Sequence, residues 1–186
     1  MKKKPKAEVV SSEELDDALK EALLEDTEFK KYKRIVQQIK EESDPEDLAR
    51  EAKRLHSGRK SRTLVKTPGP DAVLEASFQD SANRSRLTQI RVDLTNQEGV
   101  LAEALEAMRA HILFKYEAFL PGLRTKGDRA AHLNQYLRRG VNLRNKTLTL
   151  LSIIDLYIKD IDQMSFTLKH AIDVIEMIYN QKGRVA

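Results

Sequence analysis

Residues 148–161, which read LTLLSIIDLYIKDI, decide the fold. Their apolar residues recur at alternating spacings of three and four, which places them along one stripe of an α-helix. Residues 147–150 also alternate with period two, as a strand would, but no hairpin turn or partner strand lies nearby. The stretch therefore predicts a long helix within residues 128–179. Its seam positions are Leu133, Leu137, Gly140, Leu151, Ile154, Ile158, Ile161, Leu168, Ile172 and Ile175.

A second series with the same spacing precedes this one and stops at Pro121-Gly122. Proline and glycine end helices, so the series predicts one helix before the break. Two helices joined by a short polar loop return antiparallel. Residues 87–186 are therefore expected to form a long antiparallel helical hairpin of coiled-coil type. The first helix carries Leu94, Leu101, Leu105, Met108, Ile112 and Phe119 along its seam.

The apolar content of these helices exceeds what one hairpin can hide. Leu150, Ile153 and Leu156 widen the stripe beyond the strict seam, and such surface is usually covered by other subunits. We therefore expect a homo-oligomer. The alternative is that residues 11–58 fold back and cover this surface within one chain. The residues expected at the subunit interface are Leu101, Leu105, Met108, Ile112, Leu151, Ile154, Ile158, Ile161, Leu168 and Ile172.

The N-terminal part has shorter helical signals. Residues 1–10 are basic and irregular and are expected to be disordered. Residues 11–66 predict a small helical module, with capping boxes at Ser11 and Ser43 and a left-handed stop at Gly58. Pro68-Gly69-Pro70 indicates a linker, which we place at residues 67–86.

Composition supports an all-α fold. Charged residues make up 33% of the 186 residues, and Gly, Pro and aromatic residues are few. The absence of cysteine suits a reducing compartment. An acidic run at residues 13–17 occupies the place of a signal-peptide core, and no apolar stretch is long enough for a bilayer. We expect a cytoplasmic protein, in the host cytoplasm if it is viral, with no membrane contact.

No catalytic signature is visible. Phosphate-binding loops, nucleophile elbows and paired histidine ligands are absent, and the four histidines are scattered. The acidic residues Asp155, Asp160 and Asp162 do not share one helix face, so they indicate a solvated flank better than a metal centre. We expect no enzyme activity, no cofactor and no metal.

Basic residues are more informative, because the net charge is +4 and two regions are rich in Lys and Arg. Such groups neutralise phosphates and release counterions. No aromatic residue is interleaved in either region, so base stacking lacks support there. An ordinary solvated face plus a basic linker is the alternative. The predicted nucleic-acid contacts are Arg50, Lys53, Arg54, Arg59, Lys60, Arg62 and Lys66 in the first region, and Arg124, Lys126 and Arg129 in the second, which continues through Arg138, Arg139, Arg144 and Lys146.

Residues 94–162 resemble the small terminase subunits of tailed bacteriophages. The resemblance rests on the stretches VLAEAL (100–105), YEAFLPGL (116–123) and NLRN (142–145). It implies an N-terminal DNA-binding module at residues 11–66, a hairpin that assembles into a ring, and a large packaging subunit as partner. No helix-turn-helix turn sequence is visible in the expected module.

These observations give three hypotheses. The first is a non-enzymatic, oligomeric DNA-binding protein of a phage-like system, the DNA-recognition subunit of a genome-packaging motor. The second is a helical scaffolding protein that does not bind nucleic acid. The third is a recombination mediator that binds single-stranded DNA. Salt-dependent binding separates the second from the others, because only phosphate contacts release counterions.

Overall fold

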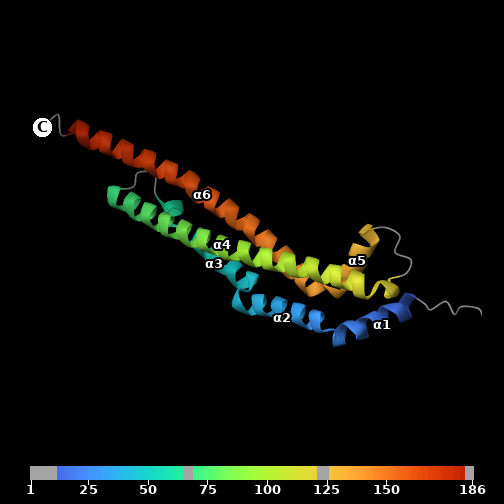
Figure 1. The fold of residues 1–186 in the computed structure, drawn as a ribbon. Helices are drawn as coiled ribbons and strands as arrows, with labels where there is room; N and C mark the ends of the chain where they lie inside the picture. Colours follow the sequence, from blue (N-terminus) through green and yellow to red (C-terminus); the bar gives the residue numbers. More distant parts are fainter. Residues whose placement is uncertain (1–11, 65–68, 121–125, 183–186) are drawn as a thin grey trace, which may run out of the picture. The chain divides into compact units, whose positions relative to one another are not determined.

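A computed structural model of the chain describes residues 12–64, 69–120 and 126–182, and every element in these ranges is helical (Figure 1). The predicted all-α class is confirmed. Residues 147–150, where a strand was the alternative, lie inside a helix. The elements are α1 (Ser12–Glu25), α2 (Thr27–Glu42), α3 (Pro45–Ser57), η1 (Lys60–Thr63), α4 (Pro70–Lys115), η2 (Glu117–Phe119), α5 (Lys126–Tyr136) and α6 (Arg138–Lys182).

Helix starts follow local capping chemistry. Asp26 precedes α2, and its Oδ1 accepts a hydrogen bond from the Phe29 amide at 2.9 Å. Asp44, not Ser43, is the N-cap of α3, and its Oδ1 accepts from the Glu46 amide at 2.9 Å. Gly58 ends α3 with φ −83°, so the expected left-handed stop is wrong. The first predicted capping box begins at Ser11, outside the described residues.

Residues 70–86, expected within a linker, form the first turns of α4. Proline has no amide hydrogen to lose at the first position of a helix, so Pro70 starts this helix instead of interrupting it. Asp71 adds a favourable negative charge in the first turn. Val73 and Ala76 are fully buried, three residues apart. The linker expected at these residues is therefore part of a helix.

The chain forms two compact units, and each is built from separated segments. Unit 1 contains α1, α2, the part of α4 from Gly99, η2, α5 and the start of α6 through Arg144. Unit 2 contains α3, η1, α4 through Glu98, and α6 from Asn145. The expected division into residues 11–66 and 87–186 differs from this, because α1 and α2 belong to one unit and α3 to the other.

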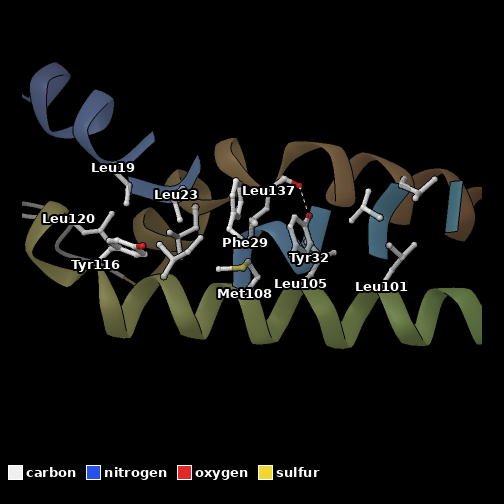
Figure 2. Packing of buried hydrophobic residues seen from close by; sticks show 14 of the residues in the cluster. Leu19, Leu23, Phe29, Tyr32, Leu101, Leu105, Met108, Tyr116, Leu120 and Leu137 are labelled. Carbon is white, nitrogen blue, oxygen red and sulfur yellow. Dashed lines mark hydrogen bonds between the residues drawn. The ribbon is translucent and has the colours of Figure 1, made fainter. Parts of the chain in front are cut away.

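The core of unit 1 joins α1 and α2 to the second part of α4 and to α5 (Figure 2). Leu19, Leu23 and Phe29 pack in one cluster with Leu105 and Met108. The Tyr32 hydroxyl donates a hydrogen bond to the Leu137 carbonyl at 3.2 Å, which fixes α2 on the α5–α6 junction. In this unit the N-terminal helices therefore cover the seam of α4. The fold-back alternative concerns the widened stripe of the later helix, where Ile153 and Leu156 are 37% and 64% exposed.

Unit 2 contains an antiparallel helix pair. Leu87, Ile90 and Leu94 of α4 pack with Ile154 and Ile161 of α6, and α3 adds Ala52. Two ion pairs show the direction of the two helices: Arg84 Nε lies 2.5 Å from Asp162 Oδ1 and Arg91 Nε 2.6 Å from Asp155 Oδ1. Seven residues forward on α4 correspond to seven residues back on α6. The predicted antiparallel long helices are thereby confirmed.

The residues expected at a subunit interface lie in or against these intrachain cores. Their burial is explained without a second subunit, and the oligomer stays a prediction. Leu101, Leu105, Met108 and Ile112 are buried in unit 1; Ile154, Ile161 and Leu168 are buried in unit 2; and Leu151, Ile158 and Ile172 are partly buried there.

Candidate nucleic-acid interface

The first predicted basic region lies in α3 and η1, where folding has used much of its charge. Arg59 is 1% exposed. Its guanidinium donates through Nη2 to the Asp160 carboxylate, and its Nη1 lies 3.7 Å from Asp80 Oδ2. Asp80 is itself fully buried. In this conformation Arg59 cannot reach a phosphate, so the expectation that it contacts DNA is corrected.

Other residues of this region are exposed but paired within the chain. Arg50 pairs with Asp47, Lys60 with Glu75, and Arg62 Nη2 lies 3.0 Å from Asp160 Oδ2. Exposed pairs are weak and can exchange partners, so these residues remain accessible to an anion at a small cost. Lys53 and Arg54 are exposed and form no ion pair with a described residue.

The second predicted basic region is described only in part. Lys66 of the first region and Arg124 of the second lie outside the described residues, as does the side chain of Lys126, which begins α5. Arg129 is exposed and already has an interaction partner. The described contacts of the first region belong to unit 2, and Arg129 belongs to unit 1.

Unit 1 contains a groove of about 960 Å³ that sequence reasoning missed. It lies between α1, α2 and the α5–α6 junction, and Glu41 is the one acidic residue among those that line it. We call its two parts the apolar floor and the basic rim. The apolar floor is Leu23, Leu24, Phe29, Tyr32, Val36 and Tyr136, and the basic rim is Lys20, Lys33, Arg34, Arg138 and Arg139.

The basic rim contains three unneutralised arginines. Arg34, Arg138 and Arg139 are exposed, and none forms an ion pair with a residue in the described ranges. Lys20 is paired with Asp17 at 2.7 Å. The Lys33 ammonium stands 4.6 Å above the Phe29 ring, a cation–π contact at the edge of the apolar floor. The charge of the groove is therefore positive.

The apolar floor is uncharged at neutral pH. Burial raises the pKa of Tyr32 to about 12, although a hydrogen bond with the Gly140 backbone and the positive charge of Arg109 oppose the shift. Burial also raises the pKa of Tyr136, and the hydrogen bond from its hydroxyl to Asp16 Oδ1 at 3.1 Å adds to the shift. The groove thus offers an apolar surface beside fixed positive charge, which is suited to an amphipathic anion.

A signal for this groove was present in the sequence. Residues 30–34 read KKYKR, a basic run with an interleaved tyrosine. Arg138 and Arg139 belong to the second basic region. No local sequence pattern shows that they line the same groove as Arg34, which lies more than 100 positions earlier in the sequence.

Among residues 12–64, 69–120 and 126–182 there is no group of three or more His, Cys, Asp or Glu residues that could hold a metal ion. None of the described helices combines the length and the apolar character needed to cross a membrane. The fold and groove define an all-helical protein with a basic, apolar-floored groove. No family model, curated protein or solved structure matches the chain.

Proposed function

We propose that the protein is a non-catalytic DNA-binding protein that holds the phosphate backbone with the basic rim of the unit 1 groove. The observation that carries this proposal is that Arg34, Arg138 and Arg139 are exposed without an acidic partner among the described residues. Arginine presents a planar fork of donors that matches phosphate geometry. Each guanidinium that replaces a condensed counterion adds affinity for any DNA sequence.

The wider role that we propose is DNA recognition in a phage-like system, as the small subunit of a genome-packaging motor. Its support is the resemblance of residues 94–162 to terminase small subunits. Such a role needs contacts with further copies and with a large packaging subunit. The outward side of α6 offers a surface for them, because Leu156, Phe166 and Met177 are 64%, 70% and 60% exposed.

The proposal is tested by titrating labelled DNA with the protein at several salt concentrations. Replacing Arg34, Arg138 and Arg139 together by Ala should lower the magnitude of the slope d log K/d log[salt] by about 2–3, since each phosphate contact contributes roughly 0.7–0.9. The matched control replaces Arg50, Arg54 and Lys60 by Ala, three exposed cations of α3 and η1.

A larger loss in the control variant would return DNA binding to α3 and contradict the assignment to the groove. If the unmodified protein binds no DNA at low salt, the proposed function is wrong and the scaffolding hypothesis takes its place. Far-ultraviolet circular dichroism of both variants should match that of the unmodified protein, because all six replaced residues are exposed.

A further inference from the structure

We infer that the groove of unit 1 takes single-stranded DNA, with bases against the apolar floor and phosphates on the basic rim. The inference rests on the proposed function and goes beyond it, because phosphate contacts alone do not distinguish a duplex from a single strand. The distinguishing observation is that the free arginines border an apolar surface.

The apolar floor has no use in duplex recognition. A duplex presents phosphates, sugars and base edges, while the apolar faces of its bases are stacked on one another. A duplex on the basic rim would leave the apolar floor uncovered. A single strand can turn its bases away from its phosphates, so apolar base faces and charged backbone meet different surfaces.

The dimensions and charges of the groove suit such a strand. Its volume of about 960 Å³ is at the upper end of the roughly 300–1,000 Å³ of ordinary small-ligand sites. Leu24 is 58% exposed in the apolar floor, so a base can pack on it without displacing the core. Lys33 already stands over the Phe29 ring, which shows that a cation and an aromatic surface lie within one contact distance here.

In the folded chain, aromatic side chains line the same groove as the basic residues. In the two basic regions of the sequence no aromatic side chain is interleaved, which argued against base stacking. Folding supplies aromatic side chains from elsewhere. Tyr136 of α5 is partly exposed and lines the same groove as Arg138 and Arg139, whereas Phe29 and Tyr32 of α2 line it as buried side chains, each 5% exposed.

The first experiment uses the unmodified protein and needs no variant. The probes are an oligothymidylate of about 15 nucleotides, within the usual range of single-strand site sizes, its duplex with oligodeoxyadenylate, and an abasic strand of equal length. We expect the oligothymidylate to bind roughly tenfold more tightly than the abasic strand, because stacking on a protein surface adds about that factor per base. We also expect it to bind more tightly than the duplex.

The second experiment places a reporter in the groove. The chain has no tryptophan, so Leu24→Trp introduces a single fluorophore at the apolar floor. Phe114→Trp is the matched control, because Phe114 is 91% exposed in α4 and does not line the groove. Oligothymidylate should quench Leu24→Trp saturably, with a midpoint that rises with salt, and should leave Phe114→Trp nearly unchanged.

The outcomes separate the inference from the proposed function. Equal binding of oligothymidylate and the abasic strand, or tighter binding of the duplex, overturns the inference and leaves DNA binding intact. Single-strand binding that does not quench Leu24→Trp places the site elsewhere and also overturns it. If no DNA binds at low salt but polyglutamate quenches Leu24→Trp, both proposals fail and the groove is a site for acidic polypeptides.

Discussion

Asp26 is a buried carboxylate that joins three segments of unit 1. It accepts hydrogen bonds from the Phe29 amide at 2.9 Å, Lys115 Nζ at 2.7 Å and the Tyr116 hydroxyl at 2.8 Å, and its Oδ2 lies 3.0 Å from His111 Nε2. Burial alone would raise its pKa, but these bonds, that of Lys115 foremost, outweigh burial and hold the pKa of Asp26 well below its usual range. The residue therefore favours folding in its ionised form.

We expect Asp26→Ala to lower the free energy of unfolding at pH 7 by about 2–3 kcal/mol, because it removes a helix cap and leaves buried donors unpaired. Asp26→Asn should cost less, since Asn also caps helices. A carboxyl group whose pKa is lowered in the folded state stabilises the fold at pH values above its unfolded pKa of about 4. This stabilisation is lost as the pH falls through the folded pKa. Urea unfolding should thus show the gap between Asp26→Asn and the unmodified protein narrowing below about pH 4. An equal gap at pH 7 and in strong acid would contradict this account.

Gly140 lies where α6 begins against Tyr32 of α2. A Cβ at this position would overlap the Tyr32 hydroxyl and lie 3.0 Å from its Cζ and 3.2 Å from Val36 Cγ2. Gly140→Ala should therefore destabilise unit 1 by roughly 1–3 kcal/mol, although alanine is the better helix former. Tyr32→Phe removes the hydroxyl, so thermal unfolding of the double variant should show a smaller loss than the sum of the two single losses. Strict additivity would show that the two side chains do not compete for space.

Arg59, which precedes η1, joins this segment to α4 through Asp80 and to α6 through Asp160 in unit 2. Arg59→Ala should cost about 3–5 kcal/mol, because it leaves the fully buried Asp80 without its counterion. Arg62→Ala, which removes a 40% exposed partner of the same Asp160, should cost about 1 kcal/mol or less. Chemical denaturation of the two variants provides the comparison. Similar small losses would mean that Asp80 does not depend on Arg59 as its counterion.

Element types were predictable from periodicity, and element boundaries were not. The three-four spacing of residues 148–161 outweighed the local alternation at 147–150, because a helix needs no partner strand. Pro70 begins a helix where a linker was expected, because proline interrupts a helix from its interior but is favoured in its first turn, and the sequence alone does not show on which side of the proline the helix lies. The burial of Arg59 was also not predictable, since its partners Asp80 and Asp160 are distant in the sequence.

The oligomer prediction depends on the outward side of α6, where Leu156, Phe166 and Met177 are exposed. Ile154→Asp places a carboxylate at a fully buried position and should unfold unit 2, at a cost of several kcal/mol. Leu156→Asp, two residues further on and 64% exposed, should leave the fold intact. Light scattering and circular dichroism then distinguish association from folding. If Leu156→Asp lowers the mass without loss of helix, the outward side of α6 is the subunit contact; a monomeric unmodified protein would refute the oligomer.

The candidate groove could be predicted only in part. Residues 30–34 indicate a basic surface with an aromatic residue. The opposite side of the groove comes from Arg138 and Arg139, and no local sequence pattern shows that these arginines lie beside residues 30–34. Packing of Tyr32 on the α5–α6 junction makes that connection. Tertiary contacts of this kind decide where charges accumulate, so a count of basic residues along the chain pointed to α3 instead.

The shared helices have a consequence for how the protein melts. The chain leaves unit 1 after α2, forms the first part of unit 2, returns to unit 1 at Gly99 and enters unit 2 again at Asn145, so each unit is discontinuous in sequence. No contiguous fragment contains one whole unit without also containing part of the other, and a cut within residues 43–98 would interrupt unit 2 and separate the two segments of unit 1. A ligand that occupies the groove adds RT ln(1 + [L]/Kd) to the stability of the state that binds it. Because α4 and α6 each contribute to both cores, the two units should unfold in a single transition. A ligand bound in the groove of unit 1 should therefore raise the unfolding temperature of unit 2 as well, which calorimetry would detect as one shifted peak.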